Sequence, residues 1–203
     1  MMVTRGALMA TLGCCLVVAA AAVGFTYRGS EAAVPRGSAP RGLFAWLGQT
    51  SLPQGWTQLV GVPSVGSLPV PPGFRAVAGD PGTLTAVLLG PGGAYLGYLN
   101  ATPRQGGERL HGWPTFRLEH LRDEDARSAR EDRAVQRVRT GTALRSCVVD
   151  DYVTRVGSHD FHEIACLVVQ HSASSVIVGA TPSRDPAHVW AELQRAVAAY
   201  SAD

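Results

Sequence analysis

Apolar side chains form one continuous run near the start of the chain and shorter, interrupted runs after it. Residues 7–25 contain no charged side chain and are almost all apolar. As a helix at about 1.5 Å per residue, a run of this length spans roughly 28 Å, close to the ~30 Å hydrocarbon core of a bilayer. We therefore predict that residues 1–27 form an N-terminal signal anchor or a signal peptide.

Three interpretations of this run are open. It is retained as a single-pass anchor, it is cleaved as a signal peptide at the A-x-A site of residues 20–22, or it is a lipoprotein signal with Cys14 lipidated. Each one exports the rest of the chain, although counting the flanking Arg residues alone weakly favours the opposite topology. We expect a single-pass protein of the cell membrane with its C-terminal domain extracytoplasmic; the alternative is secretion.

A segment rich in Gly, Pro and Arg follows, and we predict that residues 28–51 form a tether. The apolar patch of residues 43–47 interrupts it. This patch either lies in the membrane interface, where Trp is favoured, or docks onto the folded domain. We favour docking.

The folded domain is predicted over residues 52–203. Its first part contains short β-prone runs separated by turn formers such as the Gly90–Pro91–Gly92–Gly93 sequence. These runs cover residues 56–60, 67–70, 83–89 and 94–100.

A helix is predicted to begin at Pro114, because proline suits the first helical turn, with Phe116 and Leu121 on its inner side. Basic and acidic side chains alternate over residues 117–139, with pairs such as Asp123 and Arg127 four residues apart. This mixture is typical of a solvated face.

Three strands and a helix complete the pattern. The strands are predicted at residues 143–154, 159–170 and 175–180, and the helix is predicted to begin at Pro186 with Asp185 as its cap. This order predicts an α+β fold, an antiparallel sheet flanked by helices. The last helix carries a core-facing apolar stripe made of Val189, Trp190, Leu193, Val197 and Tyr200.

The strongest local signal is a predicted β-hairpin with its loop at residues 155–158. Gly157 suits the left-handed conformation that such a turn requires. With this loop, Cys147 lies directly opposite Cys166, so we predict a cross-strand disulfide. Such a bond persists in an oxidising compartment, which agrees with export.

The same register places Asp151 opposite His162 and Asp150 opposite Glu163. Two chemical interpretations follow, a metal site formed by His159, His162, Asp151 and Glu163, and a general acid/base pair in which Asp151 orients His162. Adjacent residues of a strand point to opposite faces, which separates His162 from Glu163. A structural ion pair is the simpler interpretation, so we expect no catalytic residue, metal or cofactor. The candidate interaction surface comprises Asp151, His159, Asp160 and His162.

Aromatic side chains suggest a second candidate site. Tyr95, Tyr98 and Trp113 are predicted to line a shallow groove, although core packing explains them equally well. The chain contains no G-x-S-x-G nucleophile elbow, and no glycine-rich phosphate loop joins a strand to a helix.

Composition narrows the class of partner. Of the 203 residues 46% are hydrophobic, enough for one domain with its own core. The formal net charge is +2 and there is no basic tract that could follow a phosphate backbone, so nucleic acid is excluded as an expected partner.

Four segments carry a resemblance to a known group. They are PVPPGF (69–74), YLNATPRQG (98–106), GWPTFRLEHL (112–121) and SCVVDDYVTRVGSHDFHEIACLV (146–168). Over about residues 67–200 the chain resembles membrane-anchored or secreted actinobacterial proteins that lack an assigned function. Their element order is similar to the PsbP-like α/β/α sandwich. The resemblance implies the sheet-plus-helices architecture and the paired cysteines, and it implies no chemistry.

These observations favour a non-catalytic module, attached to the membrane by its N-terminal helix, that binds another cell-envelope protein or a wall component. The first alternative is a carrier of a small molecule or lipid in a cleft between sheet and helices. The second is a small hydrolase that uses His162 and Asp151.

Overall fold

The structure, a computed structural model, describes residues 42–48, 51–184 and 187–202. The predicted anchor and most of the predicted tether lie outside these residues, as do Asp185 and Pro186. No helix in the described ranges is long and apolar enough to cross a membrane.

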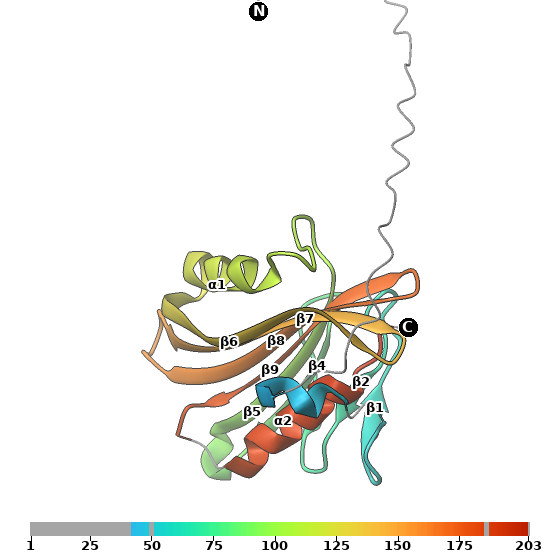
Figure 1. The fold of residues 1–203 in the computed structure, drawn as a ribbon. Coiled ribbons are helices and arrows are strands. Elements are labelled where there is room, and N and C mark those ends of the chain that lie inside the picture. Colours follow the sequence, from blue (N-terminus) through green and yellow to red (C-terminus); the bar gives the residue numbers. More distant parts are fainter. Residues whose placement is uncertain (1–41, 49–50, 185–186, 203) are drawn as a thin grey trace, which may run out of the picture. The chain divides into compact units, whose positions relative to one another are not determined.

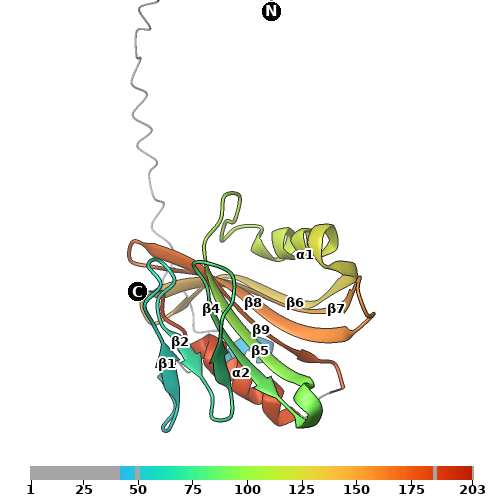
Figure 2. The same ribbon diagram turned by 180° about the vertical axis from the view of Figure 1, so that it is seen from behind.

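The domain is built on an antiparallel sheet of seven strands, in the order β3-β4-β5-β9-β8-β7-β6, with a separate pair, β1 and β2 (Figures 1 and 2). The strands are β1 (Thr57–Leu59), β2 (Leu68–Val70), β3 (Arg75–Val77), β4 (Leu84–Leu89), β5 (Tyr95–Pro103), β6 (Ala126–Thr140), β7 (Ala143–Thr154), β8 (Asp160–Gln170) and β9 (Ala173–Pro182).

Helices lie on both faces of this sheet. Helix α1 (Trp113–Glu124) packs over β6 and β7, and helix α2 (Ala187–Ala199) packs on the opposite face against β9 (Figure 1). A 3-10 turn, η1 (Gly42–Gly48), lies beside α2, and a second one, η2 (Pro91–Gly93), joins β4 to β5. The predicted α+β class, an antiparallel sheet with a few helices, is confirmed.

The β7–β8 hairpin has the predicted register. The amide of Thr154 donates to the carbonyl of His159 (3.0 Å), and Gly157 adopts a left-handed φ of 77°. Cys147 lies directly opposite Cys166, and the two form a disulfide bond.

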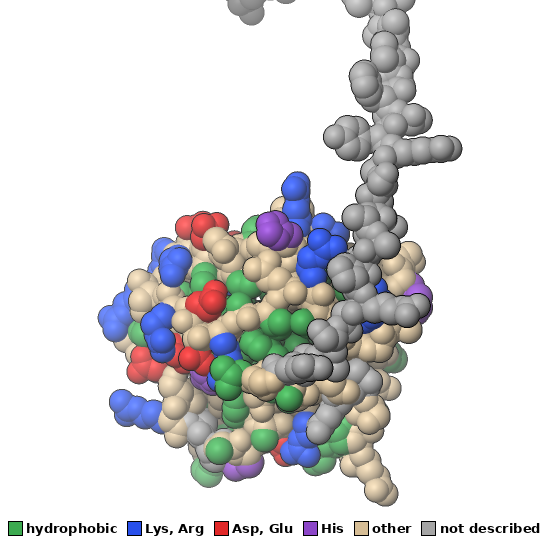
Figure 3. All heavy atoms as spheres, in the orientation of Figure 1, with side chains coloured by type: hydrophobic (Ala, Val, Ile, Leu, Met, Phe, Trp, Pro, Cys, Tyr) green, Lys and Arg blue, Asp and Glu red, His purple; other side chains and the backbone are tan. Residues whose placement is uncertain are grey.

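Strand β6 was not predicted. Helix α1 ends at Glu124, so Asp123 and Arg127 are not a helical pair, and the charged run continues as the edge strand of the sheet. Three register shifts with β7 interrupt the two-residue alternation by which a strand is recognised. Basic and acidic side chains are interspersed on this face of the molecule (Figure 3), and charged side chains protect an exposed strand edge from pairing with another chain.

The apolar patch of residues 43–47 docks onto the domain. Phe44 and Leu47 are buried in the main core, next to α2. The folded body therefore includes residues that the sequence pattern assigned to the tether.

The apolar stripe of α2 lies in the core as predicted. Val189, Leu193 and Val197 are fully buried, and Tyr200, just beyond the helix, is buried with them. Trp190 is half-buried and packs against the ring of His162.

Buried Arg145 of β7 holds the end of α2. Its guanidinium donates to the carbonyls of Val197 and Tyr200 (both 2.6 Å) and to the hydroxyl of Thr140 (2.7 Å). These bonds satisfy carbonyl groups that the end of a helix leaves without partners. Burial lowers the pKa of Arg145 to about 10, so the group remains charged at neutral pH.

Replacing this guanidinium should destabilise the domain. Arg145→Met leaves the two carbonyls buried without donors, and we expect the free energy of unfolding to fall by about 3 kcal/mol in urea denaturation. Arg139→Met, at an exposed position of β6, is the matched control and should change it by less than about 0.5 kcal/mol. Equal effects of the two substitutions would contradict the assignment.

Candidate functional site

A row of side chains crosses the sheet beneath α1. The register pairs Tyr98 with Ala180, Ala180 with Glu163, and Glu163 with Asp150. Directly opposite residues of neighbouring strands share one face of a sheet. Four strands therefore place these residues side by side on the face that α1 covers.

Helix α1 contributes the counter-charge to this row. The guanidinium of Arg117 binds the carboxylate of Glu163 in bidentate geometry, with Nε–Oε1 at 2.7 Å and Nη2–Oε2 at 2.9 Å. Burial works against the charge of Arg117, but the charge and hydrogen bonds of Glu163 outweigh it and raise the pKa of Arg117. The pair joins α1 to the middle of the sheet.

Asp150, the neighbour of Glu163 in this row, is fully buried. Neither of its carboxyl oxygens has a hydrogen-bond partner within the described part of the chain. Burial and, after it, the negative charge of Glu163 raise the pKa of Asp150 to about 9. Asp150 is therefore protonated at neutral pH, whereas the carboxylate of Glu163 is bound by Arg117.

A cleft of about 560 Å³ opens between α1 and this face of the sheet. All three residues of the predicted aromatic groove, Tyr95, Tyr98 and Trp113, line it. Tyr95 is exposed at the rim, whereas Trp113 is buried and donates its indole N–H to the carbonyl of Ala165 (3.1 Å). These side chains form part of the wall of the cleft, and Trp113 also belongs to a buried apolar cluster.

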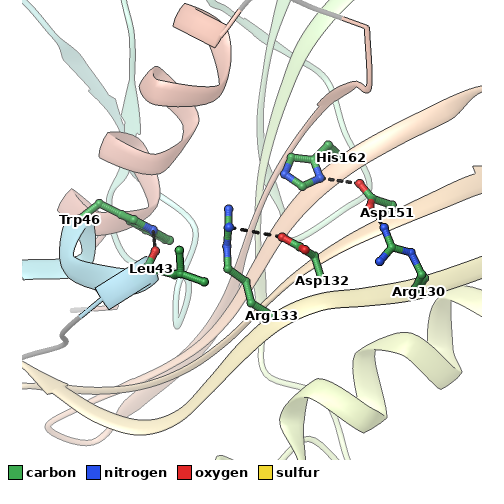
Figure 4. Close-up of polar contacts among 7 residues, drawn as sticks. All are labelled: Leu43, Trp46, Arg130, Asp132, Arg133, Asp151 and His162. Carbon is green, nitrogen blue, oxygen red and sulfur yellow. Dashed lines mark hydrogen bonds and ion pairs between the residues drawn. The ribbon is translucent and has the colours of Figure 1, made fainter.

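The predicted His162–Asp151 pair lies on the opposite face, where α2 packs. Asp151 accepts from Arg130 (2.6 Å) and contacts Nδ1 of His162 (2.6 Å), as Figure 4 shows. The imidazole packs on Trp190 with ring centroids 4.0 Å apart. Glu163 faces α1, so it does not join this pair, and no three potential metal ligands converge anywhere in the described residues.

The remaining members of the predicted interaction surface lie at the hairpin end. His159 and Asp160 are exposed and border a second hollow of about 670 Å³. This hollow shares Tyr95 and Phe161 with the cleft beneath α1. Asp160 also borders a smaller hollow together with Asp151, so it adjoins both the hairpin end and the His162–Asp151 pair.

One pair of the row, Asp150 with Glu163, was predicted from the sequence, but the pairings through β9 and the role of the row were not. The pairing of Asp150 with Glu163 follows from the hairpin register. The contribution of Arg117 does not, because it comes from a helix 46 residues earlier in the chain. No signal in the sequence identifies which of the seven Arg residues of the charged run turns inward.

No family model and no curated protein matches the chain. Among solved structures, a protein of unknown function from Pseudomonas aeruginosa is 14% identical with a TM-score of 0.42, covering 69% of this chain and 94% of that one. A protein from Bacteroides thetaiotaomicron is 11% identical with a TM-score of 0.40, covering 72% of this chain. The chain spans about half the length of the second protein, 48%. Neither description names a ligand or a reaction.

The protonated state of Asp150 predicts an unusual pH dependence of stability. Between pH 5 and pH 8 the unfolded chain has lost this proton and the folded chain keeps it, so the free energy of unfolding falls as the pH rises. This group alone contributes up to about 1.4 kcal/mol per pH unit. Asp150→Asn removes the titrating proton and should remove that part of the slope.

Urea denaturation at pH 5, 6, 7 and 8 measures the effect. The control is Asp123→Asn, at an exposed position of α1, which should keep the slope of the unaltered protein. Parallel pH profiles for Asp150→Asn and the unaltered protein would refute the assignment.

Proposed function

We propose that the protein is a non-catalytic binding domain that takes a small organic ligand in the cleft between α1 and the sheet. The cleft itself carries the proposal. Its volume, about 560 Å³, lies within the range of small-molecule sites, and its lining combines aromatic side chains, which are typical of such sites, with many charged and polar ones.

The hydrolase alternative has less support. It depends on Asp151 and His162, which lie on the other face of the sheet from the cleft. Asp151 is shared with Arg130, and the imidazole packs on Trp190. These contacts are typical of a surface ion-pair cluster with a structural role.

The proposed place of action is outside the cytoplasm, at the membrane. Two observations support it: the apolar run of residues 7–25 and the disulfide between Cys147 and Cys166, a bond that persists in oxidising compartments. The packing of α1 and α2 on opposite faces supports the further proposal that the domain is a PsbP-like α/β/α sandwich.

A second candidate function is binding of another cell-envelope protein or a wall component at the hairpin end. The observation in its favour is the hollow of about 670 Å³ bordered by exposed His159 and Asp160. The two functions are separable, because a partner bound at the hairpin end does not need the space beneath α1.

Filling the cleft tests the main proposal. Thr102 is half-buried on β5 and lines the cleft, so Thr102→Trp should occupy it and abolish ligand binding. Thr57→Trp, at an exposed position of β1, is the control and should bind as the unaltered protein does.

Native mass spectrometry of the three proteins, extracted without denaturant, provides the measurement, and circular dichroism verifies that each is folded. We expect a co-purifying small molecule with the unaltered protein and with Thr57→Trp, and none with Thr102→Trp. Equal occupancy in all three proteins, or a bare protein in every preparation, would contradict the proposal.

A further inference from the structure

We infer that the ligand of this cleft is an organic cation, an ammonium group carried on an aromatic or apolar body. The inference rests on the function proposed above and specifies the chemical class of its ligand. Three observations support it: the charged side chains that line the cleft, the ion pairs that some of them already form, and the aromatic side chains around them.

Carboxylates dominate the charged lining. A single guanidinium, that of Arg117, faces five carboxyl groups, and it is already bound by one of them through two hydrogen bonds. The five carboxyl groups belong to Asp80, Glu108, Glu124, Asp125 and Glu163.

The carboxyl groups of the lining differ in whether they already have partners. Glu124 lies 3.2 Å from His120, and Glu108 accepts from the amide of Gln105 (2.7 Å). Asp80 and Asp125 are exposed, and neither forms a side-chain ion pair within the described part of the chain. Two acidic groups of the lining, Asp80 and Asp125, thus have no ion-pair partner among the described residues.

The floor of the cleft disfavours an anion. An anionic ligand at Arg117 would compete with Glu163 for the guanidinium and would lie close to the buried carboxylate of Glu163. Removing one partner of a buried ion pair is strongly unfavourable.

The aromatic rings of the cleft also favour an organic cation. Tyr95, Tyr98, Phe116, Tyr152 and Phe161 line the cleft together with Trp113. The faces of such rings attract an ammonium group and also pack against an apolar body. Burial and then the charge of Glu163 raise the pKa of Tyr98 to about 12, so its hydroxyl stays neutral in the same negative field that favours a cation.

An organic cation fits these groups better than a metal ion. The carboxylates are spread around the cleft, and no three potential ligands converge among the described residues. The ammonium group of an organic cation would lie near the acidic side chains at the rim. Its apolar body would pack against the aromatic rings of the wall.

Three probes of one shape and different charge test the inference: 2-phenylethylammonium, 2-phenylethanol and phenylacetate. Affinities are measured by NMR titration at pH 7.5 and low salt with the full chain. We expect the ammonium probe to bind at least tenfold more tightly than the alcohol, and phenylacetate to bind most weakly.

Substitutions at the rim test whether Asp80 and Asp125 cause the preference for the ammonium probe. The double change Asp80→Asn with Asp125→Asn should weaken binding of the ammonium probe at least fivefold and leave the alcohol unchanged, whereas Asp123→Asn should alter neither. Thr102→Trp should abolish binding of both.

The outcomes separate the two proposals. If the alcohol or phenylacetate binds as tightly as the ammonium probe and Thr102→Trp abolishes that binding, the cation preference is wrong and the cleft remains a binding site. If no probe binds up to millimolar concentration, or if Thr102→Trp leaves ammonium binding intact, the inference is overturned. The binding function is then judged by its co-purifying ligand.

Discussion

The register of the β7–β8 hairpin determines which charged side chains lie on each face of the sheet. Side chains alternate along a strand, so a slip of one residue would move every side chain of β8 to the opposite face. The bond between Cys147 and Cys166 excludes such a slip, because it joins residues that lie directly opposite. Asp150 and Glu163 therefore lie beneath α1, and the ion pair of Asp151 with His162 lies beside α2.

The placement of Asp150 and Glu163 on one face of the sheet determines where α1 packs and which charged groups remain in the cleft. Two carboxyl groups lie side by side in the interior, and α1 supplies one guanidinium, so one group is ionised and paired while the other keeps its proton. A buried ion pair of this kind adds little net stability, because desolvation offsets its Coulombic attraction, but losing one partner is strongly destabilising. It orients α1 over the sheet and leaves the cleft with unpaired acidic groups at its rim.

Much of this arrangement could be predicted from local patterns. Gly157 and the two cysteines indicate the hairpin and its register, whereas Tyr95, Tyr98 and Trp113 suggest a groove that core packing explains equally well. Strand β6 could not be predicted in this way, because its register shifts disrupt the alternation and its many charged side chains resemble those of an exposed helix. The inward turn of Arg117 could not be predicted either, since it depends on how α1 packs on strands that come later in the chain.

The protonation state of Asp150 tests most directly whether the hairpin buries an unpaired carboxyl group beneath α1. Carbon-detected NMR of the labelled protein follows the side-chain carboxyl carbon of this residue as the pH is raised. The account predicts the chemical shift of a protonated acid from pH 5 to pH 7, with a change only toward pH 9. A titration midpoint near the ordinary value of 3.8 would show that Asp150 is solvated or paired, and the account of the cleft would then be wrong.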